Sequence, residues 1–103
     1  MQTYKEVCGT ESRVWFEIRP KEGKNFLKWA KALGCVWMNR EEINSRKGAN
    51  FFHFSIHDDG TLANVAMYAW VAKQFEKVPK YMFCEFKQGR RVSPTEYWQQ
   101  HKR

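Results

Sequence analysis

The stretch that decides the fold is residues 46–60, which have the sequence RKGANFFHFSIHDDG. It joins a basic segment, a run of aromatic and aliphatic residues, and an Asp-Asp-Gly turn signal. Side chains alternate between the two faces of a strand, so the pattern predicts a strand over residues 51–57 with Phe52, Phe54 and Ile56 facing inward. The opposite face then carries Phe51, His53, Ser55 and His57. We expect the first face to join a core and the second to present rings to solvent.

The turn at Asp58-Asp59-Gly60 has two possible continuations, and they imply different folds. In one, Thr61 caps a helix over residues 62–77; in the other, residues 61–66 return as a hairpin strand before a shorter helix. Four alanines recur over residues 63–72, and alanine is the strongest helix former. The two aspartates would also lie favourably near a helix N-terminus. We therefore favour the long helix.

The remaining elements follow from alternation, helical spacing and capping signals. We expect strands over residues 14–19, 35–39 and 81–87, a helix with a lysine-rich outer face over 24–33, and a short terminal helix over 95–101. Residues 1–13 form an arm that can supply an edge strand. This order predicts a single α+β domain, residues 1–103, with a ferredoxin-like βαββαβ sandwich, an antiparallel sheet and an additional short C-terminal helix. The alternative is a dsRBD-like α-β-β-β-α core.

Charge and aromatic content favour nucleic-acid binding. Eighteen Lys and Arg against eleven Asp and Glu give a net charge of +7, and aromatic residues make up 17% of the chain. Such a domain attracts polyanions, and exposed rings can stack bases. The predicted stacking platform is Trp15, Phe51 and His53. The predicted phosphate contacts are Arg19, Arg46, Lys47, Lys24, Lys28 and Lys31.

A short motif supports the same hypothesis. Lys47-Gly48 precedes Phe52-His53-Phe54, which distantly resembles the basic-Gly-aromatic strand of RNA-recognition modules, with two residues inserted and the second glycine missing. That resemblance implies base stacking on the two central strands.

A protein-binding function is the main alternative. The expected helix over residues 62–75 is apolar nearly all round, and such a helix contacts something on two sides. An inhibitor or adaptor that masks a partner's surface, or a homodimer, would use aromatic anchors. The predicted partner-binding residues are Met67, Trp70, Val71, Tyr97 and Trp98.

A third hypothesis is cleavage of RNA. Residues 23–34 and 48–60 loosely resemble the helix, Gly-His strand and turn of HicA-type toxins, although His53 follows Gly48 by five residues. The resemblance implies a catalytic histidine, His53 or His57. We assign no catalytic residue and expect no enzymatic activity.

Other features narrow the class of protein. Cys8, Cys35 and Cys84 are widely spaced and odd in number, which indicates a reducing compartment and therefore the cytoplasm. The N-terminal residues lack an apolar run, so we expect no signal peptide and no membrane segment. Two strand histidines four residues apart lie roughly 13 Å apart, too far to share one metal. We expect no metal and no cofactor.

Overall fold

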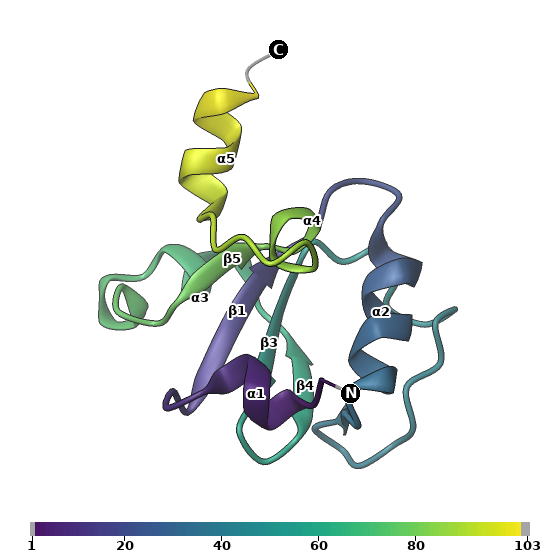
Figure 1. Cartoon of the computed structure of the whole chain (residues 1–103). Coiled ribbons are helices and arrows are strands. Elements are labelled where there is room, and N and C mark those ends of the chain that lie inside the picture. The colour runs from purple at the N-terminus through teal and green to yellow at the C-terminus, as the bar shows by residue number, and fades with distance from the viewer. Residues whose placement is uncertain (1, 102–103) are drawn as a thin grey trace.

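The computed structural model describes residues 2–101, which form an α+β domain around a five-stranded sheet (Figure 1). The strands are β1 Arg13–Glu17, β2 Val36–Trp37, β3 His53–His57, β4 Thr61–Asn64 and β5 Lys80–Met82. The helices are α1 Tyr4–Cys8, α2 Gly23–Ala32, α3 Met67–Val71, α4 Phe83–Phe86 and α5 Pro94–Gln100, with a 3-10 turn at Lys73–Phe75. The α+β class predicted from the sequence is confirmed.

The core lies on the sheet face that the alternation predicted. Phe16, Phe54 and Ile56 are fully buried there against α2. The rings of Phe26 on α2 and Phe54 on β3 stack with their centroids 4.7 Å apart. Helices α1 and α2 thus cover one face of the sheet, since residues of both belong to this cluster.

The sheet is mixed, whereas an antiparallel sheet was expected. Its order is β2-β4-β3-β1-β5. Strand β1 is antiparallel to β3 but parallel to β5, and β2 is parallel to β4. The chain order α2-β2-β3-β4-α3 does contain an α-β-β-β-α run, but β4 lies between β2 and β3 in space. Neither expected arrangement therefore describes the whole sheet.

The long helix over residues 62–77 is wrong, and the hairpin continuation is the one observed. The side chain of Asp59 accepts hydrogen bonds from the backbone N–H of Thr61 at 3.0 Å and from its hydroxyl at 2.7 Å. These bonds fix the turn, in which Gly60 has a φ of 87°, a conformation that favours glycine. Strand β4 then pairs antiparallel with β3. The helix that follows, α3, is only five residues long.

Other boundaries also differ from the expectation. The last strand stops at Met82 and gives way to α4, and β2 has two residues. Within residues 2–12 the N-terminal arm forms α1 and no edge strand. The terminal helix is confirmed, because Ser93 caps α5 by accepting from the N–H of Glu96 at 3.1 Å.

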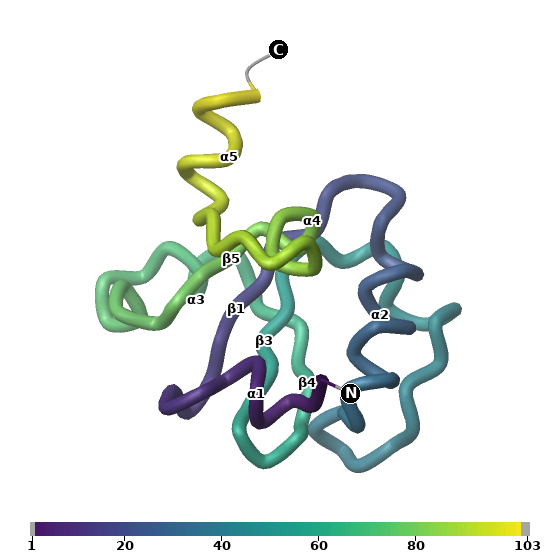
Figure 2. The backbone as a smooth tube through the Cα atoms, viewed as in Figure 1, coloured from purple at the N-terminus to yellow at the C-terminus, as the bar shows by residue number. Residues whose placement is uncertain are grey.

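Helix α3 lies on the face of the sheet opposite α2 (Figure 1). Its Trp70 stacks on Trp15, which points away from the core cluster because its neighbours Val14 and Phe16 point into it. The tube view shows the segment between β2 and β3 running beside α2 (Figure 2). The two sheet faces thus carry different surfaces, one with α2 and this loop and one with α3 and α5.

Candidate nucleic-acid interface and the covered sheet face

The predicted stacking platform lies on the second sheet face but is not open to solvent. Trp15 is 2% exposed. Its ring stacks on Trp70 at 5.3 Å between centroids and contacts Phe75 at 5.5 Å. The expectation that Trp15 shows its ring to solvent is therefore wrong, because the chain after β4 returns across this face.

His53 is also covered. Its ring lies 4.5 Å from that of Trp70, and its Nε2 lies 3.1 Å from Oε1 of Glu17. The side chain of His53 is only 11% exposed. A base could not stack on this imidazole without displacing Trp70.

Glu17 connects this pair to the C-terminal helix, because it also accepts a hydrogen bond from Nε1 of Trp98. Burial raises the pKa of the Glu17 carboxyl, but the hydrogen bonds from His53 and Trp98 lower it more, so its pKa lies below the ordinary value. The carboxylate is thus held ionised between two donors.

A pocket of about 500 Å³ opens beside the Glu17–His53 pair. Its other walls are mainly apolar and come from the ends of β1 and β3, from α3 and from α5; they include Phe52, Met67 and Trp98. Phe52 is 49% exposed. It was expected in the core, but β3 begins one residue later at His53, so Phe52 is outside the regular alternation. Its position directly after a polar loop is the only sequence signal for this.

The predicted partner-binding residues divide between surface and interior. Met67 and Val71 are exposed on α3, and Trp98 is half-buried. Trp70 and Tyr97 are buried. These last two are therefore packing residues, and Tyr68, which is 79% exposed, is the α3 ring that sequence analysis missed.

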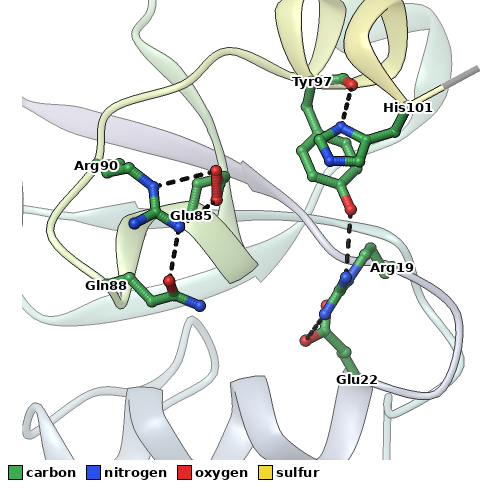
Figure 3. A network of polar contacts seen from close by, with 7 residues as sticks. All are labelled: Arg19, Glu22, Glu85, Gln88, Arg90, Tyr97 and His101. Atoms are coloured by element: carbon green, nitrogen blue, oxygen red, sulfur yellow. Dashed lines mark hydrogen bonds and ion pairs between the residues drawn. The ribbon is translucent and has the colours of Figure 1, made fainter.

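Arg19 is engaged inside the molecule. It forms a bidentate ion pair with Glu22, in which Nε and Nη2 lie 2.8 and 2.9 Å from the two carboxylate oxygens. It also donates a hydrogen bond to the Tyr97 hydroxyl at 3.2 Å (Figure 3). These bonds raise the pKa of its guanidinium further above the ordinary range. Figure 3 also shows His101 stacked on Tyr97, so Arg19 lies beneath α5. The predicted role of Arg19 as a phosphate contact would require this network to open.

The other predicted phosphate contacts lie on α2 and on the loop that packs beside it. Together with Phe51, a residue of the predicted platform, they define what we call the α2 basic surface: Lys24, Lys28, Lys31, Arg46, Lys47 and Phe51. All of its side chains are exposed. The loop approaches α2 closely, because a Cβ built on Gly23 would stand 2.9 Å from the Cα of Ala49. Leu27, Lys28 and Lys31 also line a shared depression with loop residues 42–45. The fold therefore brings together two basic segments that are distant in sequence.

One acidic side chain pairs with this surface. Glu42 lies 2.8 Å from Nζ of Lys31, and the lysine side chain lowers the pKa of the Glu42 carboxyl. No other ion pair to these cations is present within residues 2–101. Phe51 stands beside the loop, 43% exposed, with its backbone N–H bonded to Gly48. It is the platform residue that keeps an accessible ring.

The two strand histidines are separately engaged. His53 pairs with Glu17, and His57 contacts the carbonyl of Thr61 at 3.1 Å. The part of the chain that the structure describes contains no cluster of three His, Cys, Asp or Glu side chains arranged for a metal ion. Across residues 2–101, every helix is too short or too polar to span a bilayer.

No protein-family model matches the chain, and neither a curated protein nor a solved structure is detectably similar to it.

Proposed function

We propose that the protein binds nucleic acid through the α2 basic surface. The observation that carries this proposal is that the loop carrying Arg46 and Lys47, about twenty residues further along the chain, packs against the start of the helix that carries Lys24 and Lys28. Lys and Arg side chains in such an array attract phosphates and position a strand without determining its sequence. Phe51 supplies one ring for a base to stack on.

The structure lets the salt dependence be worked out. Lys31 already has a carboxylate partner, so four cations remain for phosphates. Each neutralised phosphate contributes about −0.7 to the slope of log affinity against log salt for a single strand and about −0.9 for a duplex. Affinity should therefore fall about 50- to 150-fold between about 50 and about 200 mM salt.

Fluorescence anisotropy of labelled single- and double-stranded DNA and RNA tests this expectation. Two double variants, Lys24→Gln with Lys28→Gln and Arg46→Gln with Lys47→Gln, should each reduce the slope by about 1.4 to 1.8. Equal losses from the two variants would show that helix and loop contact the same ligand.

The matched control is Lys73→Gln with Lys77→Gln, which removes the same charge from exposed positions beside α3. It should leave the slope nearly unchanged. If it weakens binding as much as the surface variants do, the effect comes from net charge and the proposed surface is wrong. Intact-RNA gels run on the same samples detect cleavage, which the HicA-type hypothesis requires and the binding proposal does not.

A second candidate function is an inhibitor or adaptor that binds protein, and the exposed apolar groups around the Glu17–His53 pocket support it. Phe52 and Met67 are exposed and line this pocket, and Val71 is exposed on the same helix as Met67. Exposed apolar groups of this kind mark interaction sites. Sedimentation velocity tests self-association, and pull-down tests other partners. A Met67→Ser, Val71→Ser variant should lose the partner, while raised salt should change binding little.

The three cysteines support a cytoplasmic location as part of this proposal. All three are free and buried. Burial raises the pKa of the Cys8 thiol to about 11 and that of Cys35 to about 12, so they act as apolar packing groups.

A further inference from the structure

A second pocket lies at the opposite end of the covered sheet face. It has a volume of about 360 Å³ and is bounded by β1, β3 and the segment that follows β4. Its polar lining groups are Arg13, Trp15, Ser55, His57 and Asn64. The lining set contains no Asp or Glu, and most of its polar groups can donate a hydrogen bond.

Arg13 lines this pocket and has no acidic partner within residues 2–101. It lies opposite His57 in the β1–β3 register, so the two side chains project from the same face. Its guanidinium lies 4.7 Å from the ring centroid of Phe75 and 5.6 Å from that of Trp15. Within residues 2–101 it has no ion pair and no hydrogen bond, whereas Arg19 and Arg90 both pair with glutamates.

His57 is oriented by its neighbour. Its Nδ1 lies 3.1 Å from the carbonyl oxygen of Thr61, and a carbonyl can only accept, so Nδ1 carries the proton in the neutral ring. The other nitrogen, Nε2, lies 3.5 Å from the hydroxyl of Ser55. Nε2 of the neutral ring is therefore an acceptor, which can take a hydrogen bond from the Ser55 hydroxyl or from a P–OH group of a ligand.

Trp15 supplies an unpartnered donor. Its indole Nε1 is buried and has no hydrogen-bond partner among the described residues, although buried polar groups in proteins are nearly always paired. The rings of Trp70 and Phe75 pack against this indole, and Trp15 also lines the pocket. An acceptor bound in the pocket would give the indole the partner that the protein does not provide.

Aromatic and thioether groups form the outer wall. Tyr68 and Met38 are both largely exposed, and they line the pocket together with Phe75, whose ring contacts the guanidinium of Arg13. A flat apolar group can lie against these side chains while an anion reaches the donors at the sheet.

We propose that this pocket binds a nucleoside monophosphate, with its phosphate at Arg13, Ser55 and His57 and its base against Tyr68 and Phe75. A guanidinium and a hydroxyl can donate to a phosphate monoester, and Nε2 of His57 can accept from its P–OH group. The pocket is on the sheet face opposite α2, so this inference goes beyond the proposed function and does not depend on it.

Calorimetric titration of the whole protein with AMP and UMP tests the proposal, with adenosine and inorganic phosphate as partial ligands. The monophosphates should bind at least about tenfold more tightly than either part. Arg13→Gln should weaken AMP binding about tenfold or more, and Ser55→Ala should weaken it less.

Arg91→Gln is the matched control. The guanidinium of Arg91 also lies over two rings, 4.9 Å from Phe86 and 5.8 Å from Tyr81, but it does not line the pocket. It should leave AMP binding unchanged, as should the Lys24→Gln, Lys28→Gln variant of the α2 basic surface.

A second measurement does not depend on how the variants fold. The indole N–H resonance of Trp15 in an NMR spectrum of the parent protein should shift on addition of AMP and stay in place on addition of adenosine. Equal affinity for AMP and adenosine would overturn the proposal. So would an absence of binding at about 5 mM AMP, or an Arg91→Gln variant as weak as Arg13→Gln.

Discussion

Substitution of Gly23 by alanine is the sharpest test of how the α2 basic surface is built. Gly23 begins α2 and is buried beneath the loop that carries Arg46 and Lys47. A Cβ at this position would stand 2.6 Å from the carbonyl carbon of Ala49 and closer still to its oxygen, whereas ordinary contact begins at 3.4 Å. Glycine is required here for a close approach of two backbones.

The expected magnitude follows from that geometry. The backbone at Ala49 must retreat by roughly 1.5 Å, and overpacking of this kind costs about 1–3 kcal/mol. The better helix propensity of alanine offsets less than about 1 kcal/mol, because Gly23 is the first helical residue. The net loss of about 1–2 kcal/mol should lower the Tm by roughly 5–15 °C in a domain of this size.

Nucleic-acid binding should change in parallel. A displaced loop withdraws Arg46 and Lys47 from α2, so the salt slope should fall by up to about 1.4 to 1.8, as in the loop double variant. Gly89→Ala is the control, since it introduces strain at a φ of 87° but meets nothing within 4 Å. It should lower the Tm without changing the slope. Circular dichroism melting and the anisotropy salt series measure both quantities. A Gly23→Ala protein as stable as the parent and with the parent's slope would refute this account of the surface.

Two further predictions concern the covered sheet face. The pKa of Glu17 lies below its ordinary value of 4.5, because its hydrogen bonds outweigh the opposing effect of burial. The ionised carboxylate therefore contributes to the free energy of unfolding above about pH 4.5, and this contribution is lost as the pH falls through the lower pKa of the folded state. Glu17→Gln should cost about 1–2 kcal/mol near neutral pH, and urea unfolding from pH 3 to pH 7 should show the gap to the parent closing at acid pH; a gap independent of pH would contradict the assignment. Trp15→Ala should cost about 3–5 kcal/mol of stability yet leave nucleic-acid affinity unchanged at temperatures where the variant is folded, whereas a specific loss of binding by folded protein would restore the predicted platform.

Sequence patterns predicted the core face well because that signal is local and redundant. Phe54 and Ile56 alternate with polar residues on β3, and Phe16 lies between Trp15 and Glu17 on β1. All three are fully buried, and a shift of one residue would have moved every one of them to the opposite face of the sheet. The helix over residues 24–33 and the helix capped by Ser93 were also predicted well, because for each of them several independent sequence signals agreed.

The segment after Gly60 shows where such signals conflict. Alanine content favoured a helix, but Leu62 becomes fully buried when it pairs with Ile56 across the hairpin. That burial, together with the side-chain bonds of Asp59, outweighs a propensity difference of a few tenths of a kcal/mol per residue. A single sequence does not reveal the partner strand, so the competition could not be decided before the structure.

The same limit explains why Lys24, Lys28, Arg46 and Lys47 are exposed, as expected, while Trp15 and His53 are covered. Alternation assigns Trp15 and His53 to a face, but what covers that face depends on the later path of the chain. Burial of aromatic rings stabilises the fold, so α3 packs over them. Burial of an unpaired lysine or arginine destabilises the fold, so Lys24, Lys28, Arg46 and Lys47 stay exposed. Lys80 is partly buried instead, and burial disfavours its charged form and so lowers its pKa. Its Nζ donates a hydrogen bond to the carbonyl of Phe75 at 2.9 Å. Cations thus remain at the surface in almost any fold, and what the structure adds is which of them converge.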